Sequence, residues 1–136
     1  MNVQSKIGEA TTDSQLASPV IQRIGIIGAG QMGNGISHVC ALAGLPVVLL
    51  DAKKDALDKA MAAMARNMDR QVNRDLISPL EKADALARVT PTTDYAAFGD
   101  CDLVIEAATE KEDIKRAIYQ ALTPHLKPDC MIASNT

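Results

Sequence analysis

The sequence is poor in aromatic residues, with one Phe, two Tyr and no Trp among 136 residues. The interior must therefore be filled by Ala, Ile, Leu, Val and Met. No apolar run approaches membrane-spanning length, so no membrane segment is expected. The net charge of −3, without a basic cluster, argues against a nucleic-acid partner. An apolar content of 47% in a chain of this length fits one globular domain with a real core.

Cysteine and histidine are also scarce. Cys40, Cys101 and Cys130 are odd in number, scattered and without a CxxC pair, which is typical of small buried thiols. His38 and His125 lie far apart, without the spacing of metal ligands. No metal site is predicted, and the thiols suit a reducing, cytoplasmic location.

Residues 1–21 are rich in Ser, Thr, Gln and Asp and predict a flexible leader, not a secretory signal or transit peptide.

A glycine-rich turn between two apolar runs is the most informative stretch. Arg23 to Ile27 predict a buried strand, and the letters G-A-G-Q-M-G follow at residues 28–33. A helix is predicted over residues 31–43, and a second strand over residues 46–50 leads to Asp51. This order is a βαβ unit with a dinucleotide-binding fingerprint. The apolar positions expected to form the packed face of the helix are Met32, Ile36, Val39, Cys40 and Ala43.

The fingerprint assigns a physical role to each part. Gly28 allows the tight turn, Gly30 lets a pyrophosphate approach the backbone, and Gly33 lets the helix pack close to the sheet. The helix N-terminus suits a diphosphate. Asp51 is placed to bind the adenosine ribose and would repel a 2′-phosphate, which favours NAD(H) over NADP(H), a preference that residues 53–54, both Lys, weaken slightly. The alternative is a tight turn in an α/β protein that binds no nucleotide. The predicted pyrophosphate-binding positions are Gly28, Ala29, Gly30, Gln31, Met32 and Gly33.

The remaining pattern predicts an α/β fold of Rossmann type over residues 22–136. Helices are expected over residues 54–74, 78–87 and 111–122, and strands over 88–90, 102–106 and 130–133, with a turn that includes one helical turn around 94–97. Right-handed crossovers then give a doubly wound parallel sheet of order 3-2-1-4-5, with helices on both faces. Ligands bind where the first and fourth strands diverge, at their carboxyl ends.

Two of these helices have informative faces. In the helix over residues 54–74 an apolar stripe predicts core packing, and the cationic residues opposite are either solvated or meet a phosphate-bearing substrate. The stripe is Leu57, Met61, Met64, Met68 and Val72, and the cationic face is Lys59, Arg66, Arg70 and Arg74. In the helix over residues 111–122 the expected packed face is Ile114, Ala117, Ile118 and Leu122.

Three segments together resemble one enzyme family. The segments are the block from the glycine turn to Asp51, D-L-V-I-E-A-A-T-E at 102–110 and A-S-N-T at 133–136. Together they are similar to the NAD-binding domain of the 3-hydroxyacyl-CoA dehydrogenases. The 3-hydroxybutyryl-CoA dehydrogenase branch looks closest, and the resemblance covers residues 22–136. The second and third segments are more specific than the glycine block, which many dehydrogenases share.

The resemblance implies further roles. Glu110 would contact the nicotinamide side of NAD, and Lys115 would contact the cofactor; from position alone they could equally be a helix N-terminal acid and a solvated lysine. Asn67 and Arg74 fall near positions where the family contacts coenzyme A. The family's general-base histidine and helical dimerisation domain follow its S-N-T motif, and neither His38 nor His125 matches that histidine, so no catalytic residue is assigned here.

The expected function follows from the resemblance. The chain would be a truncated NAD-binding half of an enzyme that interconverts (S)-3-hydroxyacyl-CoA and 3-oxoacyl-CoA in fatty-acid β-oxidation or butanoate metabolism. The parent would use acyl-CoA as substrate and form a homodimer, and the fragment alone would bind NAD(H) weakly without turnover. Two alternatives stay open: another β-hydroxyacid or UDP-sugar dehydrogenase, and a non-catalytic NAD-sensing module.

Overall fold

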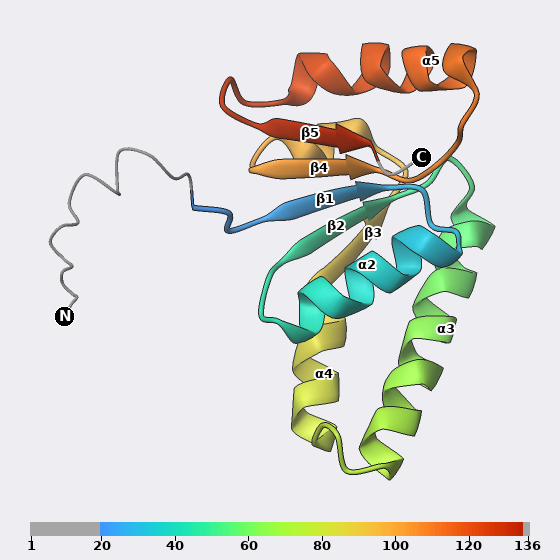
Figure 1. Cartoon of the computed structure of the whole chain (residues 1–136), viewed down its shortest axis with the longest axis vertical. Coiled ribbons are helices and arrows are strands. Elements are labelled where there is room, and N and C mark those ends of the chain that lie inside the picture. The colour runs from blue at the N-terminus through green and yellow to red at the C-terminus, as the bar shows by residue number, and fades with distance from the viewer. Residues whose placement is uncertain (1–19, 135–136) are drawn as a thin grey trace, which may run out of the picture.

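A computed structural model describes residues 20–134 and contains a five-stranded parallel sheet of order β3-β2-β1-β4-β5 (Figure 1). The predicted strand order is therefore confirmed. The predicted leader, residues 1–21, lies outside the described residues except for its last two positions, of which Ile21 packs against the core. The strands are β1 (Ile24–Ile27), β2 (Val47–Leu50), β3 (Val89–Thr92), β4 (Leu103–Glu106) and β5 (Met131–Ser134).

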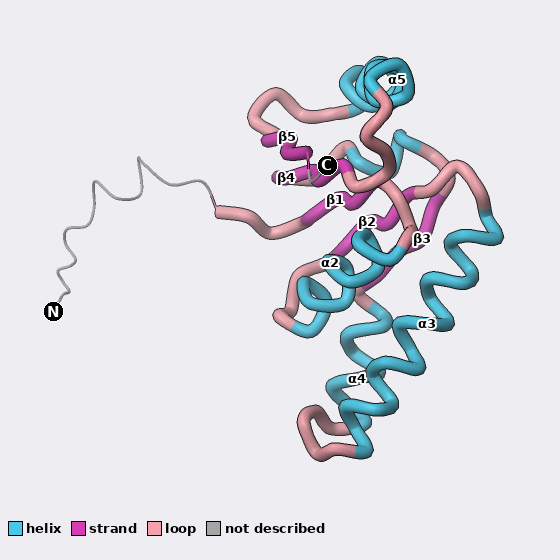
Figure 2. The backbone as a smooth tube through the Cα atoms, turned by 45° about the vertical axis from the view of Figure 1, so that its right-hand side comes forward, coloured by secondary structure: helices cyan, strands magenta, loops and turns pink. Residues whose placement is uncertain are grey.

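Helices cover both faces of the sheet, which confirms the doubly wound architecture (Figures 1 and 2). One face carries three helices and the other carries α5 with two short 3-10 turns. The helices are α2 (Gln31–Leu42), α3 (Lys54–Asn73), α4 (Pro79–Ala87) and α5 (Glu112–Leu122), and the 3-10 turns are η1 (Tyr95–Phe98) and η2 (Thr123–His125).

Alternation along the strands divides the interior into two cores. Ile26 and Leu49 face α2, α3 and α4, where Met64 and Met68 of α3 are fully buried. The other core lies toward α5, η1 and η2 and holds the one phenylalanine of the chain, Phe98, with no exposed surface. The aliphatic and methionine core expected from the composition is confirmed, and in the second core Phe98 packs edge-to-face with Tyr95.

Both edge strands extend beyond their predicted limits. β3 continues to Thr92 although it contains Pro91, because an edge strand leaves one side of its backbone unpaired and tolerates a missing N–H. β5 includes Ser134, which was expected in the following loop. Ser134 therefore lies in register with Glu106 at the carboxyl end of β4.

The predicted packed face of α2 is wrong in part. Met32 and Val39 are 52% and 67% exposed, whereas the buried positions of the helix are Gly33, Ser37 and Ala41. The helix lies so close to the sheet that small side chains fill the contact, and the Ser37 hydroxyl donates to the Gly33 carbonyl at 2.8 Å. Ile36 and Cys40 pack against the core as predicted, whereas Ala43, like Met32 and Val39, is exposed.

The other helices match their predictions more closely. In α3 the predicted stripe is buried at Leu57, Met64 and Met68 and partly buried at its other two positions. The four residues of the predicted cationic face are exposed, and the last of them, Arg74, follows the helix. α4 begins with a capping box in which Ser78 Oγ accepts the Glu81 N–H at 3.0 Å. α5 packs through Ile118, Tyr119 and Leu122. Ile114 and Ala117, both predicted on its packed face, are exposed, Ile114 by 42%.

Candidate functional site

The turn after β1 is in backbone contact with the loop after β4. Gly28 has a φ of 106°, in the left-handed region, and its N–H donates to the Leu50 carbonyl at 2.7 Å. A Cβ at this position would lie 2.8 Å from the Cα of Ala108 and 2.9 Å from the carbonyl oxygen of Ala107. Only a residue without a side chain fits there, as the motif predicts.

The other two glycines of the motif have opposite surroundings. A Cβ on Gly33 would lie 1.7 Å from the Gly28 carbonyl oxygen, so the first turn of α2 rests directly on the turn before it. A Cβ on Gly30 would meet no protein atom within 4 Å. Gly30 also precedes the N-terminus of α2, which no side chain caps. Open space at an uncapped helix N-terminus suits an anionic group.

Asp51, at the end of β2, holds the glycine turn. Its Oδ2 accepts the Ala29 N–H at 2.9 Å, and its Oδ1 accepts the Lys53 N–H at 2.9 Å. The sequence predicts a ribose contact for this carboxylate but not its bond to the turn. Asp51 therefore fixes the local backbone while it borders the open space beside Gly30.

A cavity of about 440 Å³ lies at the carboxyl ends of β1, β2 and β4. Its walls combine the glycine turn, the end of β2 and the loop after β4, which is the position expected for a ligand in a doubly wound sheet. It is lined by Gly28, Ala29, Gly30, Asp51, Lys53, Ala56, Lys59, Ala107 and Ala108.

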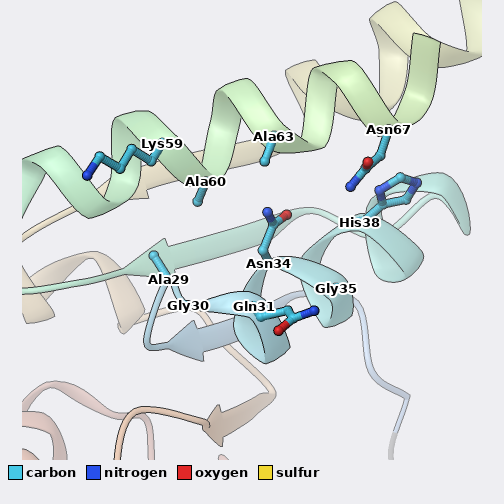
Figure 3. A pocket seen from close by; sticks show the side chains of 10 residues that line it. All are labelled: Ala29, Gly30, Gln31, Asn34, Gly35, His38, Lys59, Ala60, Ala63 and Asn67. Carbon is cyan, nitrogen blue, oxygen red and sulfur yellow. The ribbon is translucent and has the colours of Figure 1, made fainter. Parts of the chain in front are cut away.

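A second cavity, of about 500 Å³, extends from the glycine turn between α2 and α3 (Figure 3). It shares Ala29, Gly30 and Lys59 with the first cavity, so the two are neighbours. Asn34 points across it toward α3, and its buried Oδ1 has no hydrogen-bond partner within residues 20–134. A bound group that donates a hydrogen bond would satisfy this oxygen. The remaining lining residues are Gln31, Gly35, His38, Ala60, Ala63 and Asn67.

A buried carboxylate closes the β4 side of the site. Glu106 has no exposed surface. Its Oε2 accepts the N–H groups of Ala108 and Thr109 at 2.7 and 3.1 Å, and its Oε1 accepts the Ser134 hydroxyl at 3.0 Å. Lys115 Nζ donates to Ser134 Oγ at 3.2 Å and lies 3.8 Å from Glu106 Oε1.

Of the two residues predicted on the nicotinamide side, only Lys115 has side-chain partners within residues 20–134. Glu110 is exposed and, among the residues described, its side chain makes no hydrogen bond or ion pair. Lys115 is directed to Glu106 and Ser134. Sequence reasoning did not assign a role to Glu106. The signal was present, because an acidic residue ends an otherwise apolar buried strand and must have partners there.

Burial controls the titrating groups around the sheet. It raises the pKa of Tyr95, and the charge of Asp51 raises it further. Burial also raises the pKa of Cys101 to about 11 and raises the pKa values of Cys40 and Cys130. These thiols are free, and at neutral pH they are protonated and poorly nucleophilic.

Residues 20–134 contain neither a cluster of metal ligands nor a membrane-spanning helix. No group of three His, Cys, Asp or Glu side chains there could hold a metal ion. No helix in that range is long and apolar enough to cross a membrane. The two cavities beside the glycine turn form the candidate site.

Comparison with known proteins places this geometry in a family. The profile described as "3-hydroxyacyl-CoA dehydrogenase, NAD binding domain" matches residues 23–136. The chain belongs to this family. The predicted resemblance and the predicted NAD cofactor are thus confirmed. The 3-hydroxyacyl-CoA dehydrogenase domain includes both the glycine turn and the segment around Glu106, so the two halves of the site lie within one family match.

Individual 3-hydroxyacyl-CoA dehydrogenases give the extent of the match. The 3-hydroxybutyryl-CoA dehydrogenase of Bradyrhizobium diazoefficiens is 48% identical over 117 residues, which is 86% of this chain and 40% of that protein. The fatty acid oxidation complex subunit alpha of Psychrobacter cryohalolentis is 37% identical over 85% of this chain and 16% of that protein. The crystal structure of (S)-3-hydroxybutyryl-CoA dehydrogenase from Ralstonia eutropha superposes with a TM-score of 0.83 and 41% identity, covering 86% of this chain and 41% of that one. The chain thus spans well under half the length of these relatives.

Proposed function

We propose that this chain binds NAD(H) and forms the cofactor-holding half of an enzyme that interconverts (S)-3-hydroxyacyl-CoA and 3-oxoacyl-CoA. The observation that carries the proposal is the open space at Gly30, bordered by Asp51 and by the uncapped N-terminus of α2. A pyrophosphate fits the open space at Gly30 and the helix N-terminus, and a ribose hydroxyl can donate to the Asp51 carboxylate. NAD, when bound, supplies the hydride acceptor.

The chain's own residues bind and orient. Residues 28–33 present backbone to the pyrophosphate, and Asp51 accepts hydrogen bonds from the adenosine ribose. Glu110 and Lys115 are assigned to the nicotinamide side, over the carboxyl end of β4. No general base is assigned among residues 20–134, since burial leaves the thiols protonated and neither histidine lines the cavity beside Asp51. The family resemblance, which implies a general-base histidine after the S-N-T motif, supports leaving the transfer of the substrate hydroxyl proton unassigned among these residues.

The substrate and assembly proposals rest on the relatives. Several of them are named for 3-hydroxybutyryl-CoA or fatty acid oxidation, which supports an acyl-CoA substrate. Asn67 borders the second cavity, and Arg74 follows α3, so both could meet coenzyme A.

We also propose a homodimeric parent in the cytoplasm. The protonated free thiols suit that reducing compartment.

Titration of the 136-residue chain with NADH and NADPH tests the proposal. We expect NADH to bind more tightly than NADPH and the chain not to reduce acetoacetyl-CoA. Asp51→Asn keeps an oxygen to accept the Ala29 N–H but removes the negative charge. It should lower the preference for NADH over NADPH by about tenfold.

A matched substitution controls for a general loss of negative charge. Asp84→Asn, on the exposed surface of α4, should leave the preference for NADH over NADPH unchanged. No NADH binding by the unsubstituted chain would contradict the proposed function. An unchanged preference in Asp51→Asn would contradict the role of Asp51, and reduction of acetoacetyl-CoA would contradict the absence of a general base.

A further inference from the structure

Glu106 is the one acidic side chain among residues 20–134 that is buried. Burying a carboxylate is costly unless hydrogen bonds surround it, so its partners show what holds it. Three hydrogen-bond donors and the ammonium group of Lys115 converge on its two oxygens, and they come from three separate segments of the chain. The last residue of β4 is therefore a buried carboxylate, at a position where an apolar residue could have packed without any hydrogen-bond partner.

The first pair of donors shapes the loop after β4. The N–H groups of Ala108 and Thr109 both point to Oε2 of Glu106, which folds the loop back over the end of its own strand. The same loop presents Ala107 and Ala108 to the cavity and touches Gly28 through backbone atoms. Glu106 thus sets the position of one wall of the cofactor cavity.

The second pair of donors forms a chain of contacts to α5. Lys115 Nζ donates to Ser134 Oγ, and the Ser134 hydroxyl donates to Oε1 of Glu106. Lys115 is only 15% exposed in its side chain, although lysine is usually solvated. The carboxylate therefore holds the ammonium group at the carboxyl edge of β4 and β5.

The order of the strands indicates which part of the cofactor lies near Glu106, Ser134 and Lys115. If the adenosine ribose meets Asp51 at the end of β2 and the pyrophosphate lies at α2, the other nucleoside lies on the opposite side of β1, over β4 and β5. Resting on the proposed function, we propose that Glu106 is a positioning residue for the nicotinamide half of NAD(H). It acts through the 107–109 loop and, by way of Ser134, through Lys115.

Comparison of NADH with ADP-ribose, which lacks nicotinamide, tests the proposal on the 136-residue chain. Glu106→Gln has the same shape, and its amide oxygen still accepts the two loop N–H groups. Its NH2 group cannot accept from Ser134, and the charge that holds Lys115 is lost. We expect NADH affinity to fall about tenfold and ADP-ribose affinity to change less than about twofold.

Two further variants make the test specific. Glu112→Gln removes a charge from the exposed first turn of α5 and should change neither affinity. Ser134→Ala keeps the buried carboxylate but removes the hydroxyl that accepts from Lys115 and donates to Glu106, and it should reproduce the selective loss of NADH affinity. If Glu106→Gln does not fold, as judged by circular dichroism, Ser134→Ala decides the question by itself.

A double variant separates positioning from a structural role. In a Lys115→Met background, Glu106→Gln should cause less than about a twofold further loss of NADH affinity, because its action through Lys115 is already gone. Equal losses for NADH and ADP-ribose, or additive losses in the double variant, would overturn the role of Glu106 while leaving NAD(H) binding intact. Absence of NADH binding by the unsubstituted chain would overturn the proposed function, and this inference with it.

Discussion

Single residues in the glycine turn have distinct physical requirements. Gly28 needs both a left-handed backbone and the absence of a side chain, because the Ala107–Ala108 backbone fills the space beside it. Gly33 needs only the absence of a side chain. Gly30 needs neither for folding, since its surroundings are open and its φ is −73°. The three positions therefore respond differently to the same added methyl group.

Gly30→Ala should separate binding from folding. Its methyl group enters the space assigned to the pyrophosphate, so NADH affinity should fall at least about tenfold. The free energy of unfolding should change by no more than about 1 kcal/mol, the cost of a poorer residue before the helix. Titration with NADH and urea denaturation measure the two quantities. Gly99→Ala, where a Cβ would make an ordinary 3.6 Å contact, is the control, and equal NADH binding by both variants would refute the assignment.

Gly33→Ala should do the reverse and act on stability. A methyl group 1.7 Å from the Gly28 carbonyl forces α2 away from β1, because backbone cannot yield as a flexible side chain does. We expect a loss of about 3 kcal/mol in the free energy of unfolding, seen as a lower urea midpoint with an unchanged slope. A midpoint equal to that of the unsubstituted chain would show that the helix does not rest on the turn.

Sequence reasoning was most successful for residues whose requirements are local. The spacing of the glycines predicted the close packing at Gly33, because that contact arises within one βαβ unit, but it did not predict that Gly28 meets the loop after β4. It did not predict Glu106, whose partners Ser134 and Lys115 come from β5 and α5. The strand alternation also could not show that Asp51 holds the Ala29 N–H, since that bond depends on the exact path of the turn.

At the scale of elements, periodicity predicted helices better than it predicted their inner faces. In α3 the stripe of methionines was correctly assigned to the core, because the helix is strongly amphipathic. In α2 the larger apolar residues were assigned to the core, yet Gly33 and Ala41 occupy it. A helix that must approach a sheet at a glycine turn selects small residues for its contact, and hydrophobicity alone does not report that constraint.

The core stripe of α3 yields a stability prediction. Met64 has no exposed surface, so Met64→Ala should leave a cavity and lower the free energy of unfolding by about 3 kcal/mol. Met61, on the same helix, is only half-buried and should cost about 1 kcal/mol when replaced by Ala. Urea denaturation of the two variants measures both values. Equal losses at both positions would contradict the assigned inner face.

For the whole molecule, the order of strands was predictable because βαβ connections have one hand. The lengths of β3 and β5 were not, since edge strands are defined by a single partner. A cluster at the opposite, amino edge of the sheet was also missed. There the Asp102 carboxylate accepts the N–H groups of Gln22 and Arg23 at 2.8 and 3.1 Å and pairs with Lys127.

This cluster should make the stability of the molecule depend on acid. The hydrogen bond from Lys127 and then that from Gln22 lower the pKa of Asp102. A lowered pKa in the folded state gives stability that is present above the ordinary carboxyl pKa and lost as pH falls through the folded value. The thermal midpoint should therefore drop as the pH falls below the ordinary carboxyl pKa of about 4, and that of Asp102→Asn should drop less. The exposed neighbour Asp100→Asn is the control, and equal drops in all three proteins would contradict the assignment.

The contact between Gly28 and the Ala107–Ala108 backbone has a consequence for how the domain can diverge. β1 and β4 are paired neighbours, and the gap that opens beyond them, between the turn after β1 and the loop after β4, is bounded by peptide groups. Replacing the two alanines changes the lining of that gap, while its width stays a property of the main chain. Variation in specificity is thus separable from the spacing that admits a dinucleotide at all.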